Sequence, residues 1–168
     1  KRGKHSGKDI PMCGVPVHNH EIYLSRLIRM GFKVAVCEQT EDPLETKQRG
    51  PKAVVKREVV RIITPGTITE DTLLDSRRNN YLVAVAEAQG RFGLAWLDMS
   101  TGDFQVQAVV ESGLAAALAR IEPGEILLSD KFIQRGSATN IFEPWLEQLT
   151  CLPKSRFDST NGRKRLED

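Results

Sequence analysis

The spacing of apolar residues in positions 1–67 predicts a helix followed by two strands. After Asn19, a residue suited to cap a helix, apolar side chains recur at helical spacing until Gly31 ends the pattern. The face that they form contains Ile22, Tyr23, Leu27 and Met30. Residues 33–38 are a short apolar run that predicts a buried strand, and the β-branched residues in 56–63 predict a second strand. We also expect a short helical turn after Pro43.

The segment 64–67 (TPGT) predicts the turn that ends the second strand. Pro65 fixes its own φ near the value that a turn needs, and Gly66 is expected to take a positive φ. The charged and weakly helical residues that follow are typical of a connection between units. We therefore expect a first unit at 1–67 and a connection at 68–77.

Residues 78–168 carry a pattern richer in strands. Three β-rich runs are separated by two short segments suited to hairpin turns, which predicts an antiparallel meander. These runs are 81–88, 92–99 and 104–110. A helix capped by Ser112 comes next and stops at Pro123, and residues 125–128 predict a fourth strand. The apolar face of this helix contains Leu114, Ala117, Leu118 and Ile121. Weaker elements are expected near 130–135 and 142–149, and an extended run at 151–158.

The two patterns together predict an α/β protein with two units. The β-β-β-α-β order of the second unit is the opening of a ribonuclease-H-like layout, in which helices pack against a mixed sheet. Other α/β folds begin in the same way, so the order by itself carries no activity. Because the chain begins on Lys1 rather than Met and ends without a polar tail, we expect it to be an internal piece of a longer protein.

Composition narrows the class of protein only slightly. The net charge of +2 is close to balance, so nucleic-acid binding can be argued only from local clusters of charge. No stretch approaches the roughly 18 to 20 apolar residues of a membrane span, and no signal peptide is recognisable, which predicts a cytoplasmic protein. The three cysteines lack a C-x-x-C spacing, so we expect reduced thiols rather than a disulfide scaffold.

Three segments resemble the MutS family, in the order and approximate spacing of that family. Residues 10–18 (IPMCGVPVH) resemble its I-P-M-x-G-[IV]-P-x-H stretch. Residues 34–39 (VAVCEQ), with Asp42 and Pro43 shortly after, form the second segment, and residues 57–67 (REVVRIITPGT) the third. Downstream, residues 80–82 (NYL), 92–93 (FG) and 97–102 (LDMSTG) are similar to the opening strands of the MutS connector domain.

The resemblance implies that residues 1–67 are the C-terminal part of the mismatch-recognition domain and that 78–168 are a C-terminally truncated connector domain. The family reads mismatches with a Phe-x-Glu motif, whose Phe wedges into the base stack. That motif lies upstream of the K-R-G segment matched by residues 1–3 and is absent from this sequence. The ATPase, which uses ATP and Mg, belongs to a later domain. The resemblance thus implies that this piece is not an enzyme and holds no cofactor.

Basic residues near the N-terminus are candidates for contact with DNA. Lys1, Arg2 and Lys4 stand beside glycines, which suits phosphate contacts that hold a duplex without reading its sequence. The resemblance places Lys1 and Arg2 on a DNA-proximal segment, and the alternative is a solvated terminus. A second basic cluster is better interpreted as a solvated strand face. Its residues are Arg49, Lys52, Lys56, Arg57 and Arg61.

Arg163, Lys164 and Arg165 are candidates for binding a protein partner. In the family, this surface of the connector takes part in docking the MutL-type partner, which the resemblance implies here. Family members can carry neutral polar residues at these positions, so the basic triplet departs from that pattern. The alternative, favoured by the charge alone, is a solvated terminus.

Two groups of residues carry atoms that could bind a metal. Cys13, His18 and His20 carry suitable ligand atoms for zinc, but their C-x4-H-x-H spacing matches no strong zinc pattern. Asp98 and Asp103, with Glu87, raise the possibility of a two-metal nuclease. That chemistry needs an acid inside the first strand, which lacks one at 81–86, so the two aspartates are better interpreted as turn residues.

The favoured hypothesis is a part of a bacterial, nucleoid-associated DNA mismatch-repair protein. This part would support the mismatch reader, contact the DNA backbone without specificity, and relay signals to the ATPase and to a MutL-type partner. The partners would be mismatched double-stranded DNA and that MutL-type protein, and the full-length protein would dimerise through regions outside this chain. One alternative is a metal-dependent nuclease. Another is a pure protein-interaction module, in which Lys1 and Arg2 could be neutralised without loss of binding.

Overall fold

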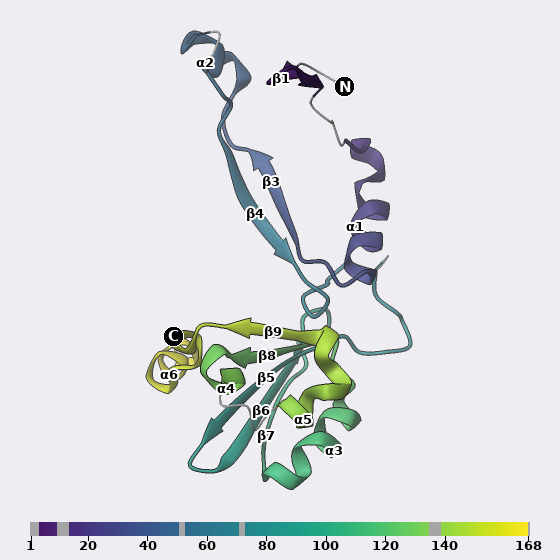
Figure 1. The fold of residues 1–168 in the computed structure, drawn as a ribbon, viewed down its shortest axis with the longest axis vertical. Helices are drawn as coiled ribbons and strands as arrows, with labels where there is room; N and C mark the ends of the chain where they lie inside the picture. Colours follow the sequence, from purple (N-terminus) through teal and green to yellow (C-terminus); the bar gives the residue numbers. More distant parts are fainter. Residues whose placement is uncertain (1–3, 10–13, 51–52, 71–72, 135–138, 168) are drawn as a thin grey trace.

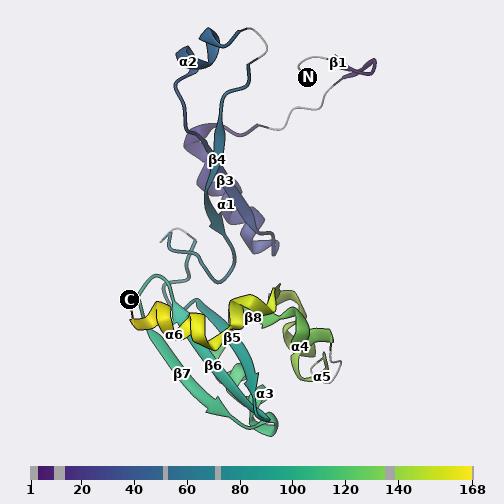
Figure 2. The ribbon, with the colours of Figure 1, turned by 90° about the vertical axis from the view of Figure 1, so that its left-hand side faces the viewer.

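The structure is a computed structural model that describes residues 4–9, 14–50, 53–70, 73–134 and 139–167. It has an N-terminal arm (residues 4–67), a connecting segment (68–79) and a C-terminal unit (80–167). The arm extends away from the C-terminal unit, and both views show the two parts meeting at the base of the hairpin β3–β4 (Figures 1 and 2). No helix in the described ranges is long and apolar enough to cross a membrane.

The arm contains one longer helix and a two-stranded hairpin. Its elements are β1 (Lys4–His5), β2 (Lys8–Asp9), η1 (Val17–Asn19), α1 (His20–Arg29), β3 (Val34–Gln39), α2 (Pro43–Gln48) and β4 (Arg57–Ile63). β3 and β4 pair antiparallel, with a bulge between Val36 and Cys37. The predicted helix, both strands and the helical turn after Pro43 are therefore confirmed.

Helix α1 ends as the sequence predicts, but its buried face is a different one. Gly31 has a positive φ of 79°, and the amide of Phe32 donates to the carbonyl oxygen of Leu27, which satisfies the end of the helix. Leu24 and Ile28, four residues apart, are the buried side chains of α1. They form a small core with Ile63 and Ile68. The predicted face of α1 is therefore wrong: contact with Ile63 and Ile68 buries the neighbouring face, which carries Leu24 and Ile28.

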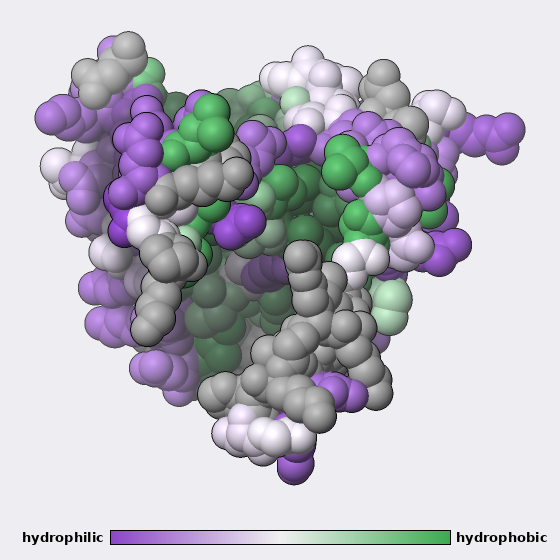
Figure 3. Space-filling view, turned by 90° about the horizontal axis from the view of Figure 1, so that it is seen from above, coloured by the Kyte–Doolittle hydropathy of each residue, from purple (hydrophilic) through white to green (hydrophobic). Residues whose placement is uncertain are grey.

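The arm leaves much apolar surface exposed. Ile22 is 53% exposed and Leu27 is 41% exposed. On β4, Val60 and Ile62 are exposed too, on the face of the strand opposite to the buried Ile63. Strand β3 is at most half-buried, which corrects the prediction of a buried strand. Seen from the arm end, hydrophobic surface fills the middle of the molecule between hydrophilic rims (Figure 3).

The C-terminal unit is a mixed five-stranded sheet with helices against it. Its elements are β5 (Tyr81–Ala88), β6 (Arg91–Asp98), β7 (Phe104–Val109), α3 (Glu111–Ile121), β8 (Glu125–Ser129), α4 (Asp130–Gln134), α5 (Thr139–Phe142), η2 (Glu143–Gln148), β9 (Leu149–Leu152), η3 (Lys154–Phe157) and α6 (Ser159–Glu167). The strand order is β7-β6-β5-β8-β9. The first three strands form the predicted meander, whereas β5, β8 and β9 run parallel.

The core of this unit lies between the sheet and α3. The four apolar positions predicted to form the inner face of α3 are all buried, so that prediction is confirmed. Phe132 packs edge-on against both Phe92 and Phe142, which closes the core beside α4 and α5.

Two details of the C-terminal unit differ from the sequence prediction. Helix α3 begins at Glu111, so Ser112 lies within its first turn and is not the cap. The extended run predicted for 151–158 ends at Leu152, and η3 and α6 follow it. Helix α6 was not predicted, because its nine residues contain one apolar side chain, Leu166, and so lack a periodic face.

Candidate functional site: the joint at Glu125

A buried carboxylate lies where the arm meets the C-terminal unit. Glu125 begins β8, and its side chain is 3% exposed. Within its own unit, the Thr150 hydroxyl donates a hydrogen bond to Oε1 at 2.5 Å. From the arm, the Gly66 amide donates to Oε2 at 3.2 Å, and the Thr64 hydroxyl donates to the same oxygen. The two carboxylate oxygens thus bond to different parts of the molecule.

A lysine of the arm completes the surroundings of Glu125. Lys33 Nζ lies 3.9 Å from Glu125 Oε1, and the lysine side chain is 48% exposed. An ion pair with one partner in solvent contributes about 0–1 kcal/mol. A hydrogen bond to a charged group contributes about 1.5–3 kcal/mol. The hydroxyl and amide donors therefore stabilise this carboxylate more than the lysine does.

The turn that touches Glu125 is closed by its own hydrogen bonds. The Thr67 amide donates to the Thr64 carbonyl oxygen at 3.0 Å, and the Thr64 amide donates to Thr67 Oγ1 at 2.9 Å. Gly66 is not among the glycines with positive φ, which corrects the prediction for this turn. A Cβ at Gly66 would lie 2.7 Å from Glu125 Cβ and 2.9 Å from Leu82 Cδ1. Glycine is needed here for close approach, not for an unusual backbone conformation.

A second contact flanks the first. Asn80, which directly precedes β5, donates from Nδ2 to the Pro65 carbonyl oxygen at 2.8 Å. A Cβ at Gly124 would lie 2.5 Å from Asn80 Oδ1 and 3.4 Å from the Pro65 oxygen. Asn80 and Gly124 therefore hold the other side of the same turn. We call the contacts of residues 64–66 with Asn80, Gly124 and Glu125 the joint.

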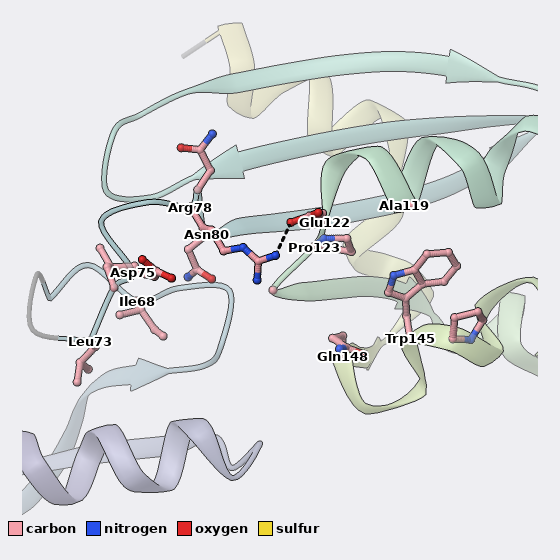
Figure 4. Close-up of a pocket in the computed structure, with 14 residues that line it drawn as sticks. Ile68, Leu73, Asp75, Arg78, Asn80, Ala119, Glu122, Pro123, Trp145 and Gln148 are labelled. Carbon is pink, nitrogen blue, oxygen red and sulfur yellow. Dashed lines mark ion pairs between the residues drawn. The ribbon is translucent and has the colours of Figure 1, made fainter.

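A cavity of about 560 Å³ lies beside the joint. The connecting segment lines one side, and the end of α3 together with η2 lines the other (Figure 4). Arg78 reaches across toward Glu122, where the Arg78 Nη2 to Glu122 Oε2 distance is 3.2 Å, while Trp145 lies on the far wall. The connecting segment thus borders this cavity and contacts the C-terminal unit across it through the Arg78–Glu122 ion pair.

Asp98 is a second buried carboxylate, at 2% exposed, and it serves a turn. It accepts hydrogen bonds from the Ser100 amide and hydroxyl, at 2.9 Å and 2.6 Å, and from the Asn80 amide at 3.2 Å. Burial acts to raise the pKa of Asp98, but the hydrogen bonds from Ser100, Asn80 and Thr101 outweigh it and hold that pKa below its ordinary value. These local donors support the interpretation of Asp98 as a turn residue.

The other parts of the proposed nuclease site are likewise engaged locally or lie elsewhere. Asp103 accepts hydrogen bonds from the Tyr81 hydroxyl at 3.1 Å and from Gln105. Burial and then this contact raise the pKa of Tyr81. Glu87 lies near the far end of β5. Within the described ranges, no group of three or more His, Cys, Asp or Glu side chains could hold a metal.

The candidate zinc ligands are Cys13, His18 and His20. Cys13 lies outside the described residues. His20 Nδ1 lies 2.7 Å from the Val17 carbonyl oxygen, a contact that belongs to the start of α1. His18 lies in η1 and is exposed. The structure thus gives His20 a role at the helix start.

The second basic cluster is largely neutralised by neighbouring acids. Arg49 Nη2 lies 2.5 Å from Glu41 Oε1, and Arg61 Nη1 lies 2.6 Å from Glu70 Oε1. Lys56 pairs with Glu58 at 2.7 Å, while Lys52 lies outside the described residues. This pairing favours the interpretation as a solvated strand face.

The predicted DNA-contact and partner-contact residues lie at the two ends of the chain. Lys1 and Arg2 fall outside the described residues, and for Lys4 only the backbone is described, paired in register with Asp9 across β1 and β2. The partner candidates all lie on α6, where their side chains are exposed. They are Arg163, Lys164 and Arg165. Arg163 Nε forms an ion pair with Glu167 at 2.7 Å, which leaves the other two facing solvent.

Sequence reasoning did not find the joint. Glu125 is an acid at the head of an apolar strand (EILLS), and Gly124 precedes it directly. A charged residue at the start of a buried strand indicates a paired, buried side chain, because charged residues are almost never fully buried without a partner. The partner itself, 59 residues earlier at Gly66, could not be found without the fold.

Two family models match the chain in succession. The model of MutS domain I matches residues 1–72, and the model of MutS domain II matches residues 80–168. The chain therefore belongs to the MutS family, and the resemblance stated from the sequence is confirmed.

Individual relatives are proteins of bacteria. The DNA mismatch repair protein MutS of Ruegeria pomeroyi is 54% identical over 166 residues, which cover 99% of this chain and 19% of the relative. The protein of the same name from Nitrobacter winogradskyi is 51% identical over 173 residues, covering 100% of this chain and 19% of the relative. That from Bradyrhizobium sp. is 52% identical over 176 residues, with the same coverage. This chain thus spans 19% of the length of these relatives.

Proposed function

We propose that this chain is part of a DNA mismatch-repair protein that binds mispaired duplex DNA. The observation that carries the proposal is the succession of MutS domain I and domain II matches over residues 1–72 and 80–168. The names of the bacterial relatives support it. A cytoplasmic, nucleoid-associated site of action belongs to the same proposal.

The two parts of the structure suit a division of labour within that protein. Residues 1–67 would be the C-terminal part of the mismatch-recognition domain, 68–77 a linker, and 78–168 a truncated connector domain. A ribonuclease-H-like layout of the connector is supported by its mixed sheet, in which a three-stranded meander precedes α3 and the parallel strands β8 and β9. The arm would support the mismatch reader, and the connector would relay its state toward the ATPase.

Lys1, Arg2 and Lys4 would contact DNA phosphates without reading the sequence, because they can supply positive charge but no wedge. This piece would not be an enzyme and would bind no cofactor, since ATP and Mg would act in a later domain of the full-length protein. The nuclease alternative gains no support, because Asp98 is engaged by the Ser100 and Asn80 donors.

Arg163, Lys164 and Arg165 would contribute to docking a MutL-type partner. Their exposure on α6 supports this, because Lys164 and Arg165 face solvent and can reach acidic groups of another protein. Dimerisation of the full-length protein would use regions outside this chain.

Two variants of equal charge test the proposed sites. One replaces Lys1, Arg2 and Lys4 with Ala, and the other replaces Arg163, Lys164 and Arg165 with Ala. Because both remove three positive charges, any general electrostatic effect is the same in each. We expect the first variant to lose duplex binding, measured by fluorescence anisotropy, and the second to retain it. For MutL-type protein binding, measured by calorimetry, we expect the reverse.

Equal loss of duplex binding in both variants would overturn the assignment to the N-terminal residues. Retention of duplex binding by both would favour the protein-interaction module instead. Retention of partner binding by the second variant would remove the docking role of α6.

A further inference from the structure

We propose that Glu125 and Gly66 set the direction of the arm relative to the C-terminal unit. The inference rests on the proposed function for its biological meaning, since it is the mismatch-recognition part whose direction would be set. Its physical content concerns the joint alone.

Glu125 divides its hydrogen bonds between the arm and the C-terminal unit. Oε1 accepts from Thr150 on β9, which lies two strands from the centre of the sheet in the order β5-β8-β9. Oε2 accepts from Thr64 and Gly66 of the arm. One planar carboxylate therefore connects the arm turn to β8 and β9 directly. Because its two oxygens move together, a displacement of the turn is transmitted to the sheet.

The backbones of the arm turn and the C-terminal unit approach each other closely at the joint. Gly66 and Gly124 both occupy positions where a Cβ would meet another atom at less than 3.0 Å. These contacts come from opposite sides of the joint, one on Glu125 and the other on Asn80. Since interiors are close-packed and resist compression, two such contacts permit little rotation of the turn against the unit.

The connecting segment also links the arm to the C-terminal unit. The connecting segment borders the cavity of about 560 Å³, and its ion pair between Arg78 and Glu122 is exposed on both sides. Exposed ion pairs contribute little to stability, because solvent screens both charges and holding two long side chains together costs entropy. The first part of the connecting segment packs with the arm, because Ile68 belongs to the arm core. Its Arg78–Glu122 ion pair adds little hold on the C-terminal unit, so we assign the direction of the arm to the joint.

The experiment measures the distance between the two parts in the whole 168-residue chain. Spin labels are attached at Glu21→Cys on α1 and Glu111→Cys on α3, in a chain whose native cysteines are replaced by Ser. The distance between the labels is measured by pulsed electron paramagnetic resonance. Both labelled side chains are exposed. We expect one narrow distance distribution in the parent chain.

Gly66→Ala is the test variant, because it inserts a Cβ into the joint without backbone strain. Gly14→Ala is the matched control, since it lies in the arm with open space around its Cβ position. We expect Gly66→Ala to shift and broaden the distribution, and Gly14→Ala to leave it unchanged. Thr64→Val, which removes one donor to Glu125 and adds no bulk, should broaden it also.

A distribution in Gly66→Ala and Thr64→Val that coincides with that of the parent would overturn the proposal. If Gly66→Ala fails to fold, as circular dichroism would reveal, Thr64→Val still decides the matter. The distance measurement contains no DNA. Its result is therefore independent of duplex binding, and the proposal for the joint and the proposed function can be contradicted separately.

Discussion

At the scale of single residues, two buried carboxylates of the C-terminal unit serve different purposes. Asp98 receives donors from Ser100 and Thr101 close by in the chain, and so fixes a turn of its own sheet. Glu125 receives donors from Thr64 and Gly66, far away in the chain, and so fixes one part of the molecule against another. Burial alone does not distinguish such residues, whereas the origin of their donors does.

Asp98→Asn should destabilise the protein at neutral pH. An amide keeps one acceptor oxygen but presents a donor to one of the backbone amides, and such an unsatisfied buried group costs about 1–3 kcal/mol. The measurement is urea unfolding at pH 7. Asp75→Asn, at an exposed turn, is the control, with an expected change within about 0.5 kcal/mol. Equal stabilities of the Asp98 variant and the parent would contradict this account.

The same residue predicts a dependence on pH. The pKa of Asp98 is lower in the folded chain than its ordinary value, so its ionised form stabilises the fold above pH of about 4. This contribution is lost as the pH falls through the folded-state pKa. Stability measured by urea unfolding between pH 7 and pH 3 should therefore fall more in the parent than in Asp98→Asn. Parallel curves would refute the assignment.

At the scale of elements, the sequence predicted best where hydrophobic periodicity met a single partner. The meander and the inner face of α3 follow from apolar spacing, because the sheet supplies one continuous apolar surface. The buried stripe of α1 was misplaced, since many of its positions are apolar and only contact with Ile63 and Ile68 selects Leu24 and Ile28. Helix α6 could not be predicted, because its polar sequence buries nothing.

Leu118→Ala tests the role of α3 in the core. Leu118 is fully buried, and removing its methyl groups leaves a cavity that costs about 2–5 kcal/mol. Leu166→Ala, on the exposed α6, should change the free energy of unfolding by less than about 0.5 kcal/mol. Urea unfolding of both variants gives the comparison, and similar costs for the two would show that the described core is incorrect.

The hairpin offers a test of its basic face. Because Arg49, Lys56 and Arg61 pair with neighbouring acids, we expect their simultaneous replacement by Ala to lower duplex affinity no more than the α6 variant that loses the same charge. Each phosphate contact contributes about 0.9 to the slope of log affinity against log salt. Anisotropy titrations over a salt series should therefore give the hairpin variant and the α6 variant the same slope. A slope smaller in magnitude by about 2 to 3 in the hairpin variant would identify this face as a DNA contact.

In the molecule as a whole, the arm and the C-terminal unit meet at the joint, which is small and polar. The sequence could indicate both units and the family, because each depends on local runs of residues. It could not indicate the joint, since Gly66 and Glu125 are brought together only by folding. The predicted DNA-contact and partner-contact residues lie at opposite ends of the chain, so the joint lies between them along the chain.

We expect this piece to hold DNA by its phosphates and to leave mismatch recognition to another segment. The most direct test is fluorescence anisotropy of the chain with matched and mismatched duplexes over a salt series. We expect weak binding with steep salt dependence and equal affinity for both duplexes, as phosphate contact without a wedge requires. A clear preference for the mismatched duplex would contradict the claim and place part of the recognition within these residues.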